Sequence, residues 1–437
     1  MYLSWLFGYA KISFHHATEP ITLSTKAGDR ISVASICKAV TPTCRLSPLL
    51  FNGHLQTCWT VTKDQTVPIY YKRKVFEAED PAFEGTFTVD FVVDEFPEHD
   101  PSLPPRTVYL SEDEFAGVGS LDSKPMLVTL HGLSGGSHEL YLRQVLAPLV
   151  TAEGGWAACV INSRGCAKSA ISNGVLYNAR ATWDTRQVVK WLRRTFPNRP
   201  LFGVGYSLGA NILTNKYVGE EGAHCELRAA VVCSNPWNLE AGSDALKSSW
   251  LGLEVYSRVM ANNMKRLVEI HKDQIMKTSK VDLDRLRKTR YLHDFDREVQ
   301  CPTWGYPTVG TYYRDASSCD SLLAIKIPFF ALNAEDDPVA PKKGIPYEEF
   351  TQNPYAVLCT TSKGGHLAWF ESDGGRWFVK PITGFLNRLA NEVQMDDASG
   401  HRKPVMNGTT TSTVGGTPKP YEFVPMRRKM YMQDFAV

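Results

Sequence analysis

The sequence predicts an α/β fold in which a mostly parallel sheet is covered by helices on both faces. From residue 125 onward, short and almost wholly apolar runs alternate with stretches of helical spacing. Continuous apolar runs are typical of strands buried on both faces, and their alternation with helices is typical of βαβ units. The predicted strands are 126–130, 156–161, 201–206, 229–233, 328–332 and 355–359.

Helices are predicted between these strands. Trp183, Val188 and Leu192 recur at helical spacing, which predicts a helix over residues 183–192. Residues 210–217 follow the third strand and form a second helix candidate.

The regions that flank this alternation have a different character. Residues 1–120 are rich in turn formers and contain a partly alternating strand pattern at 87–93. We expect them to form a β-rich N-terminal extension of a catalytic domain that spans 121–392. Residues 393–437 are polar, and we expect a disordered tail there.

Residues 237–320 interrupt the alternation between the fourth and fifth strands. An apolar stripe at spacings of three and four residues predicts an amphipathic helix in this segment. The stripe consists of Leu253, Tyr256, Met260, Met264 and Leu267. It could simply pack on the sheet, but the position of the segment favours a helical cap that lines a pocket.

Composition excludes several classes of partner. The 48 basic and 46 acidic residues leave a net charge of only +2, and they are interspersed. We therefore expect no nucleic-acid partner. No apolar run of about 18 residues occurs, so we expect no transmembrane helix. Residues 1–7 are apolar but lack the basic start of a signal peptide, and we expect them to pack on the body of the protein.

The ten cysteines are scattered and form no C-x-x-C pair. This pattern argues against a zinc site and against a disulfide-rich secreted scaffold. An intracellular, cytoplasmic location is the simplest interpretation. Peripheral contact of the N-terminus with a membrane or a lipid droplet is the alternative to a wholly soluble protein.

The strongest functional signal follows the third predicted strand. Gly205-Tyr206-Ser207-Leu208-Gly209 has the pattern Gly-x-Ser-x-Gly, with an apolar strand before it and a helix candidate after it. A serine in this setting is raised on a sharp turn, which closes because the glycines carry no side chain. The pattern is typical of the α/β-hydrolase fold and makes Ser207 the candidate nucleophile.

The partners of Ser207 follow from their order in the chain, which in this fold is serine, acid, histidine. His366 follows the sixth strand, whereas His401 lies in the polar tail, so His366 is the candidate base. Asp336 and Asp337 both follow the fifth strand, and spacing does not separate them. We expect one to hold the imidazole and the other to cap the next turn.

An oxyanion hole requires preorganised backbone N–H donors. Leu208 directly follows the nucleophile and supplies one donor. We expect the second from Leu133, in the glycine-rich loop 131–136 after the first strand. His131 is interpreted as a structural residue of this loop.

No cofactor or metal is expected. Gly203, Gly205 and Gly209 resemble a dinucleotide fingerprint, but the third glycine falls one residue late. No G-x-x-x-x-G-K-[ST] sequence occurs, so a nucleotide phosphate loop is excluded.

Several motifs together resemble the AB hydrolase 4 family over roughly residues 45–390, most closely the fungal medium-chain fatty acid ethyl ester synthase/esterases. They lie at 51–57, 131–137, 162–166, 205–211, 333–338 and 364–366. The resemblance implies hydrolysis of medium-chain acyl esters and monoacylglycerols, and acyl transfer to ethanol. It also implies membrane or lipid-droplet association. In the family pattern the first aspartate of Asp-Asp-Pro is the triad acid, which favours Asp336.

We therefore expect a serine carboxylic ester hydrolase that uses Ser207, Asp336 and His366. One alternative is an alcohol O-acyltransferase that uses the same triad with acyl-CoA and an alcohol. The H-x-x-x-D and H-x-x-x-x-D sequences of unrelated acyltransferases are absent. The other alternative is a catalytically silent binding protein, and the intact triad argues against it.

Overall fold

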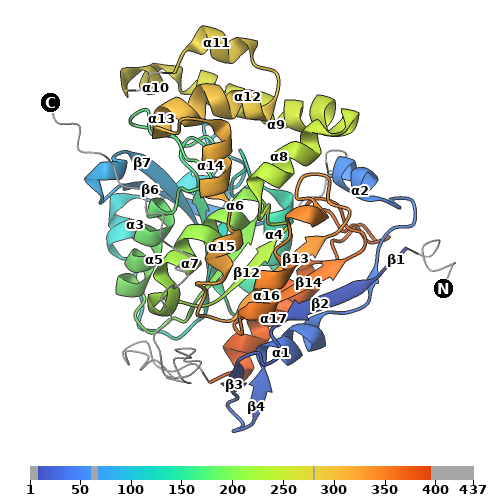
Figure 1. Ribbon diagram of the computed structural model, residues 1–437. Coiled ribbons are helices and arrows are strands. Elements are labelled where there is room, and N and C mark those ends of the chain that lie inside the picture. Colours follow the sequence, from blue (N-terminus) through green and yellow to red (C-terminus); the bar gives the residue numbers. More distant parts are fainter. Residues whose placement is uncertain (1–7, 61–66, 279–280, 395–437) are drawn as a thin grey trace, which may run out of the picture.

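The computed structural model describes residues 8–60, 67–278 and 281–394 (Figure 1). The expectations for the first seven residues and for the tail from residue 395 lie outside these ranges. A ten-stranded sheet runs through the molecule in the order β2-β14-β13-β12-β11-β9-β10-β7-β6-β8. Its strands are β2 (Ile12–His16), β6 (Tyr70–Glu77), β7 (Thr86–Val93), β8 (Thr107–Tyr109), β9 (Met126–Leu130), β10 (Ala157–Asn162), β11 (Leu201–Tyr206), β12 (Leu227–Cys233), β13 (Phe329–Ala334) and β14 (Ala356–Thr361).

Strands β9 to β14 are parallel neighbours in the centre of the sheet. They coincide with the six predicted apolar runs, and every residue of β9, β11, β13 and β14 is buried. The prediction of a mostly parallel sheet buried on both faces is confirmed.

Helices cover both faces of the sheet, and a separate apolar core lies on each side (Figure 1). One core is covered by α1 (Val33–Val40), α4 (Leu140–Val150) and α17 (Val379–Glu392). The other is covered mainly by α5 (Trp183–Thr195), α6 (Leu208–Ile212), the π-helix η3 (Leu213–Val218) and α16 (Tyr347–Gln352). Short elements complete these layers: β1 (Tyr9–Ala10), β3 (Thr22–Ser24), β4 (Arg30–Ser32), β5 (Cys44–Arg45), α2 (Gly53–Trp59), η2 (Pro81–Phe83), α3 (Glu112–Ala116), α7 (Gly219–Glu221), η4 (Gly222–His224) and η7 (Lys342–Gly344).

The N-terminal region supplies strands at both edges of this sheet. Strand β2 pairs antiparallel with β14 at one edge, and β7 pairs antiparallel with β10 at the other. Strands β6 and β8 continue the sheet beyond β7. Strands from the N-terminal region, up to residue 109, therefore complete the sheet of the catalytic region.

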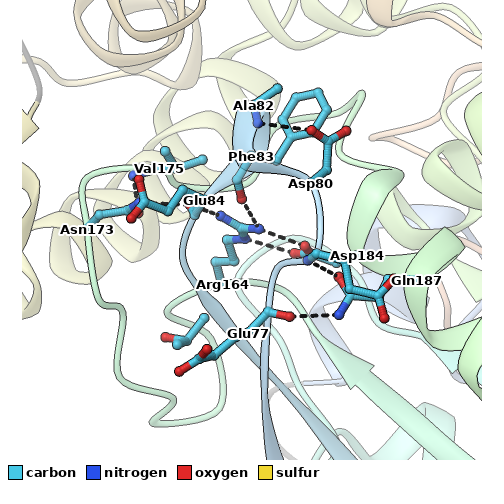
Figure 2. Close-up of polar contacts among 12 residues, drawn as sticks. Glu77, Asp80, Ala82, Phe83, Glu84, Arg164, Asn173, Val175, Asp184 and Gln187 are labelled. Carbon is cyan, nitrogen blue, oxygen red and sulfur yellow. Dashed lines mark hydrogen bonds and ion pairs between the residues drawn. The ribbon is translucent and has the colours of Figure 1, made fainter.

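Arg164 fastens the tip of the β6–β7 hairpin to α5 (Figure 2). Its buried guanidinium donates to both carboxylate oxygens of Asp184, at 2.9 and 2.8 Å. It also donates to the carbonyl oxygens of Phe83 and Glu84, at 2.7 and 2.9 Å. A planar guanidinium suits this fork of acceptors, and the bidentate geometry fixes the hairpin relative to α5.

The predicted insertion folds into helices at one end of the molecule, which include those labelled α9 to α13 at the top of Figure 1. They are α8 (Leu239–Lys247), η5 (Leu251–Ser257), α9 (Arg258–Ile270), α10 (Lys272–Thr278), α11 (Leu283–Lys288), α12 (Leu292–Phe295), η6 (Asp296–Gln300), α13 (Cys301–Trp304), α14 (Val309–Ala316) and α15 (Cys319–Leu322). The predicted stripe falls on η5 and α9, where Tyr256, Met264 and Leu267 are buried. Throughout the described ranges, every helix falls short of what a bilayer crossing requires.

Candidate active site

Ser207 occupies a strained turn between β11 and α6. Its backbone has φ 51° and ψ −119°, a conformation that is costly for a residue with a side chain. A Cβ at Gly205 would lie 2.6 Å from the carbonyl oxygen of Gly209, and one at Gly209 would lie 2.4 Å from that of His131. The glycines therefore allow the close backbone approach that the elbow pattern predicts.

The structure brings the predicted nucleophile and base together. The Oγ atom of Ser207 lies 2.7 Å from Nε2 of His366. His366 stands in the loop after β14, and Ser207 follows β11, so both side chains lie at the carboxyl edge of the parallel strands. A serine hydroxyl that donates to an imidazole is the arrangement required for general-base activation.

The implied acid, Asp336, does not contact the imidazole, so this prediction is wrong. Nδ1 of His366 lies 2.8 Å from Oδ2 of Asp337 instead. The other oxygen of Asp337 accepts from the N–H groups of Val339 and Ala340, at 2.8 and 2.9 Å. One aspartate thus holds the imidazole and also caps the following turn, the two tasks that we expected two residues to share.

The carboxylate of Asp336 contacts the backbone of the histidine loop, beside His366. Its Oδ1 accepts from the N–H of Gly365 at 3.0 Å, while Oδ2 is buried without a partner among the described residues. Burial is the main cause that raises the pKa of Asp336 to about 6, with a smaller contribution from the negative charge of Asp337, and the hydrogen bond from Gly365 opposes the shift. Adjacent side chains in this turn face different neighbours, which explains why one aspartate reaches the imidazole and the other does not.

Helix α2 positions the histidine loop, a role that the sequence reasoning missed. The Oγ1 atom of Thr57 accepts from the backbone N–H of His366 at 2.9 Å and donates to the carbonyl of Gly53 at 2.6 Å. The buried Gln56 accepts from the N–H of Phe370 at 2.7 Å. The polar residues of the motif at 51–57 were the only sequence signal for this positioning role, and that motif served only as part of the family resemblance.

The N–H groups of the loop after β9 are distributed as an oxyanion hole requires. Gly132 donates to the hydroxyl of Tyr141 at 2.8 Å, and Ser134 donates to that of Tyr177 at 2.9 Å. Between them, the N–H of Leu133 has no acceptor among the described residues. Leu208 begins α6, so its N–H has no partner within the helix.

His131 has the structural role expected from the sequence. It is buried, its Nδ1 lies 2.6 Å from the carbonyl oxygen of Gly132, and its Nε2 accepts from the N–H of Ser163 at 3.0 Å. Burial lowers the pKa of His131 to about 4, so the ring is neutral at pH 7.

A buried ionic cluster supports the same loop from the N-terminal strands. Asp90 on β7 accepts from Arg73 on β6 at 2.6 and 2.8 Å. The same carboxylate accepts from the Ser137 hydroxyl at 2.5 Å and from Nδ2 of Asn162 at 2.8 Å. The β-rich N-terminal region thereby reaches the end of the donor loop.

A pocket opens beside Ser207. Its wall combines the elbow and the donor loop with side chains of the cap, and most of the exposed wall is apolar. The apolar lining comprises Leu133, Leu208, Pro236, Leu239, Leu246, Met260, Met264, Leu292 and Val339. Across the described ranges, no group of three histidine, cysteine or acidic side chains is placed to hold a metal ion.

Comparison with known proteins identifies the family. A model described as the alpha/beta hydrolase fold matches residues 125–373, which include the elbow, the acid and the base. This chain belongs to the α/β-hydrolase family. The hydrolase is 36% identical over 367 residues to a monoacylglycerol lipase of Saccharomyces cerevisiae, covering 79% of this chain and 80% of that protein.

Two further relatives carry informative names. Medium-chain fatty acid ethyl ester synthase/esterase 2 of Saccharomyces cerevisiae is 31% identical over 393 residues, with 79% of this chain and 85% of that protein covered. Phospholipase ABHD3 of Homo sapiens is 31% identical over 251 residues, with 57% and 59% covered. The expected resemblance to α/β hydrolases, and to the ethyl ester synthase/esterases among them, is confirmed.

Proposed function

We propose that this hydrolase cleaves medium-chain acyl esters, such as fatty acid ethyl esters and monoacylglycerols, through an acyl-enzyme on Ser207. Its family and its lipase and esterase relatives identify it as an ester hydrolase that acts on lipids. One observation carries the mechanism: the continuous hydrogen-bonded chain from Ser207 through His366 to Asp337.

The proposed reaction has two half-reactions. Nε2 of His366 takes the proton of Ser207 as Oγ attacks the acyl carbonyl carbon, and Asp337 stabilises the imidazolium that forms. The C–O bond to the alcohol then breaks, and His366 returns the proton to the departing alcohol oxygen. Water, deprotonated by the same imidazole, attacks the acyl-enzyme and releases the fatty acid.

The negative charge of each tetrahedral intermediate requires donors that are already in place. The backbone N–H groups of Leu133 and Leu208 are the proposed pair. They belong to residues that line the pocket with Ser207, and the described hydrogen bonds leave both without an acceptor.

Ester synthesis by the same site is the second candidate, because one relative is named a synthase as well as an esterase. In this reaction an alcohol replaces water and attacks the acyl-enzyme, and the acyl donor is an ester or an acyl-CoA. The chemistry at Ser207 is otherwise unchanged, so the ratio of alcohol to water at the acyl-enzyme decides the product.

We further propose that the hydrolase works inside the cell and contacts lipid at its surface. The ten cysteines, all within the described ranges, form no disulfide, which suits a reducing compartment. Exposed apolar side chains occur at α2 and at the start of η5, and His54 of α2 stacks on Tyr256 of η5 at 5.7 Å. This apolar face consists of Leu49, Phe51, Leu55, Trp59, Trp250 and Leu251.

A fluorophosphonate probe tests the nucleophile directly, because it labels an activated serine without a choice of substrate. We expect the wild-type protein to be labelled and the Ser207→Ala variant to remain unlabelled. Hydrolysis of ethyl esters from acetyl to oleoyl then defines the acyl length, with a maximum in the medium-chain range. A folded wild-type protein without labelling or hydrolysis would overturn the proposal.

A further inference from the structure

Three polar side chains in the wall of the Ser207 pocket take no part in the proposed reaction. Asp296 and Gln300 come from η6 of the cap, and Asn178 comes from the loop between β10 and α5. They are 7%, 4% and 1% exposed, respectively. Buried polar groups are costly unless they are hydrogen-bonded, so each needs a partner.

Asp296 stands in the pocket without a counter-ion. Its described polar partner is the hydroxyl of Tyr313, which donates to Oδ2 at 2.6 Å. The described contacts assign no partner to Oδ1, and no described ion pair includes this carboxyl group. Burial raises the pKa of Asp296 to about 7, and the hydrogen bond from Tyr313 opposes the shift only in part. An oxygen that accepts hydrogen bonds is therefore available at this wall.

Gln300 and Asn178 each leave one buried atom unpaired. Oε1 of Gln300 and Nδ2 of Asn178 have no partner among the described residues. Their other ends fix the orientation, because Nε2 of Gln300 donates to the carbonyl of Tyr177 at 3.4 Å and Oδ1 of Asn178 accepts from the N–H of Arg180 at 2.7 Å. The wall thus offers a second acceptor and one donor.

The contacts also place these groups close to one another. Asp296 and Gln300 are four residues apart on η6, and side chains at this spacing are neighbours on a helix. Gln300 bonds to Tyr177, the residue before Asn178. On α14, Tyr312 accepts from the N–H of Ala179, the residue after Asn178, while the adjacent Tyr313 bonds to Asp296.

We propose that Asp296, Gln300 and Asn178 form a polar subsite that binds a hydroxyl group of the ester substrate. A hydroxyl donates one hydrogen bond and accepts others, so it can donate to Asp296 or Gln300 and accept from Asn178. A glycerol monoester has two neighbouring hydroxyls, which together can donate to Asp296 and Gln300 and accept from Nδ2 of Asn178. An ethyl ester of an unsubstituted acid supplies no donor at all.

This inference rests on the proposed ester hydrolysis and deepens it by naming a substrate feature. The hydroxyl can belong to the alcohol part of the ester or to a hydroxylated acyl chain. Both sources share the same chemistry. In either case the subsite distinguishes esters with a free hydroxyl from esters without one, because an unmatched pocket leaves its buried polar groups unpaired.

The test compares kcat/KM for mono-octanoylglycerol, ethyl octanoate and ethyl 8-hydroxyoctanoate in the full chain. We expect Asp296→Leu and Gln300→Leu each to lower kcat/KM for a hydroxylated ester by about tenfold more than for ethyl octanoate, the effect of one lost hydrogen bond. Loss confined to mono-octanoylglycerol assigns the subsite to the alcohol. Loss confined to the hydroxy acid ester assigns it to the acyl chain.

Asp284→Leu is the matched control, since it removes an exposed carboxylate from α11 of the same cap. This control should leave all three substrates unaffected. Equal losses on all three esters, or no loss on any, would overturn the subsite. Thermal melting and fluorophosphonate labelling show whether a variant has misfolded. Asp296→Asn changes the side chain less and replaces Asp296→Leu if that variant does not fold. A wild type that is neither labelled nor active on ethyl octanoate would instead refute the proposed function.

Discussion

His366 makes its Nδ1 hydrogen bond to Asp337, at 2.8 Å, and not to the neighbouring Asp336. Two backbone N–H groups hold the second oxygen of Asp337, so this carboxylate is fixed on both sides. The imidazole is consequently oriented with Nε2 toward Ser207, 2.7 Å away. Asp337 is therefore the residue that we assign to the acid position, and each aspartate can be tested separately.

Replacement of Asp337 by asparagine should remove most of the activity. An amide cannot stabilise the imidazolium and can hold the wrong tautomer, which in serine hydrolases lowers kcat by about 10⁴-fold. Asp336→Asn is the matched control and should retain nearly all activity, because Asp336 does not touch the ring. Steady-state kinetics with ethyl octanoate measures both variants. A larger loss in Asp336→Asn than in Asp337→Asn would refute the assignment.

The sequence identified those parts of the site that local patterns encode. Ser207 carried its own glycine pattern, and chain order left His366 as the candidate base because His401 lies in the polar C-terminal segment. Asp336 was preferred through the family resemblance, and the structure contradicts this choice. Two adjacent carboxylates at a strand end differ only in the direction that the turn gives them, and spacing holds no information on that direction.

Long-range contacts explain the other omissions. Thr57 and His366 are hydrogen-bonded but lie more than three hundred residues apart in the sequence, so no local pattern predicts the contact. The unpaired groups of Gln300 and Asn178 likewise arise from packing between the cap and the loop after β10. The central strands were predictable because their signal is local: consecutive apolar residues indicate a strand that is buried on both faces.

The buried charge of Asp336 should make stability depend on pH. Its folded-state pKa of about 6 lies above the ordinary aspartate value, so between these values the folded protein binds more protons than the unfolded chain. The stability of the wild type should therefore decrease as pH rises through this window. Asp336→Asn should be more stable than the wild type at pH 8, with the difference shrinking toward pH 4. Urea unfolding at both pH values measures it, and a gap independent of pH would contradict the argument.

Thr57 should act as a positioning residue for His366. Thr57→Val keeps the shape but removes the oxygen that accepts from the His366 N–H, so the loop loses one fixed contact. We expect kcat to decrease about tenfold with little change in KM, as for the loss of one hydrogen bond that orients the base. Thr57→Ser retains the oxygen and should restore the activity. A purely structural role would lower the melting temperature in both variants and would leave kcat unchanged.

The apolar face on α2 and η5 should bind lipid. Phe51 and Trp250 are 52% and 72% exposed, and their replacement by serine removes two large side chains from this face. The double variant should co-sediment less with phosphatidylcholine vesicles, since apolar area drives such binding, while its hydrolysis of a water-soluble short-chain ester remains normal. Leu121→Ser is the control, because Leu121 is also exposed, at 77%, but lies elsewhere. It precedes β9, at the amino ends of the parallel strands, whereas Ser207 lies at their carboxyl ends. Equal sedimentation of all three proteins would exclude this surface.

Arg164 should be essential for stability because it neutralises a buried carboxylate. Arg164→Met leaves Asp184 buried without its bidentate partner and leaves the carbonyl of Phe83 without its donor, whereas the carbonyl of Glu84 keeps the bond from Asn173 (Figure 2). Breaking a buried pair in this way costs about 3–5 kcal/mol. Burial already raises the pKa of Asp184 while Arg164 is present, so the unpaired carboxylate should bind a proton more readily in the variant.

The double variant Arg164→Met/Asp184→Leu removes both charges and should recover part of the lost free energy of unfolding. Urea denaturation of the wild type, both single variants and the double variant gives the coupling energy, and strictly additive effects would show that the two side chains act independently.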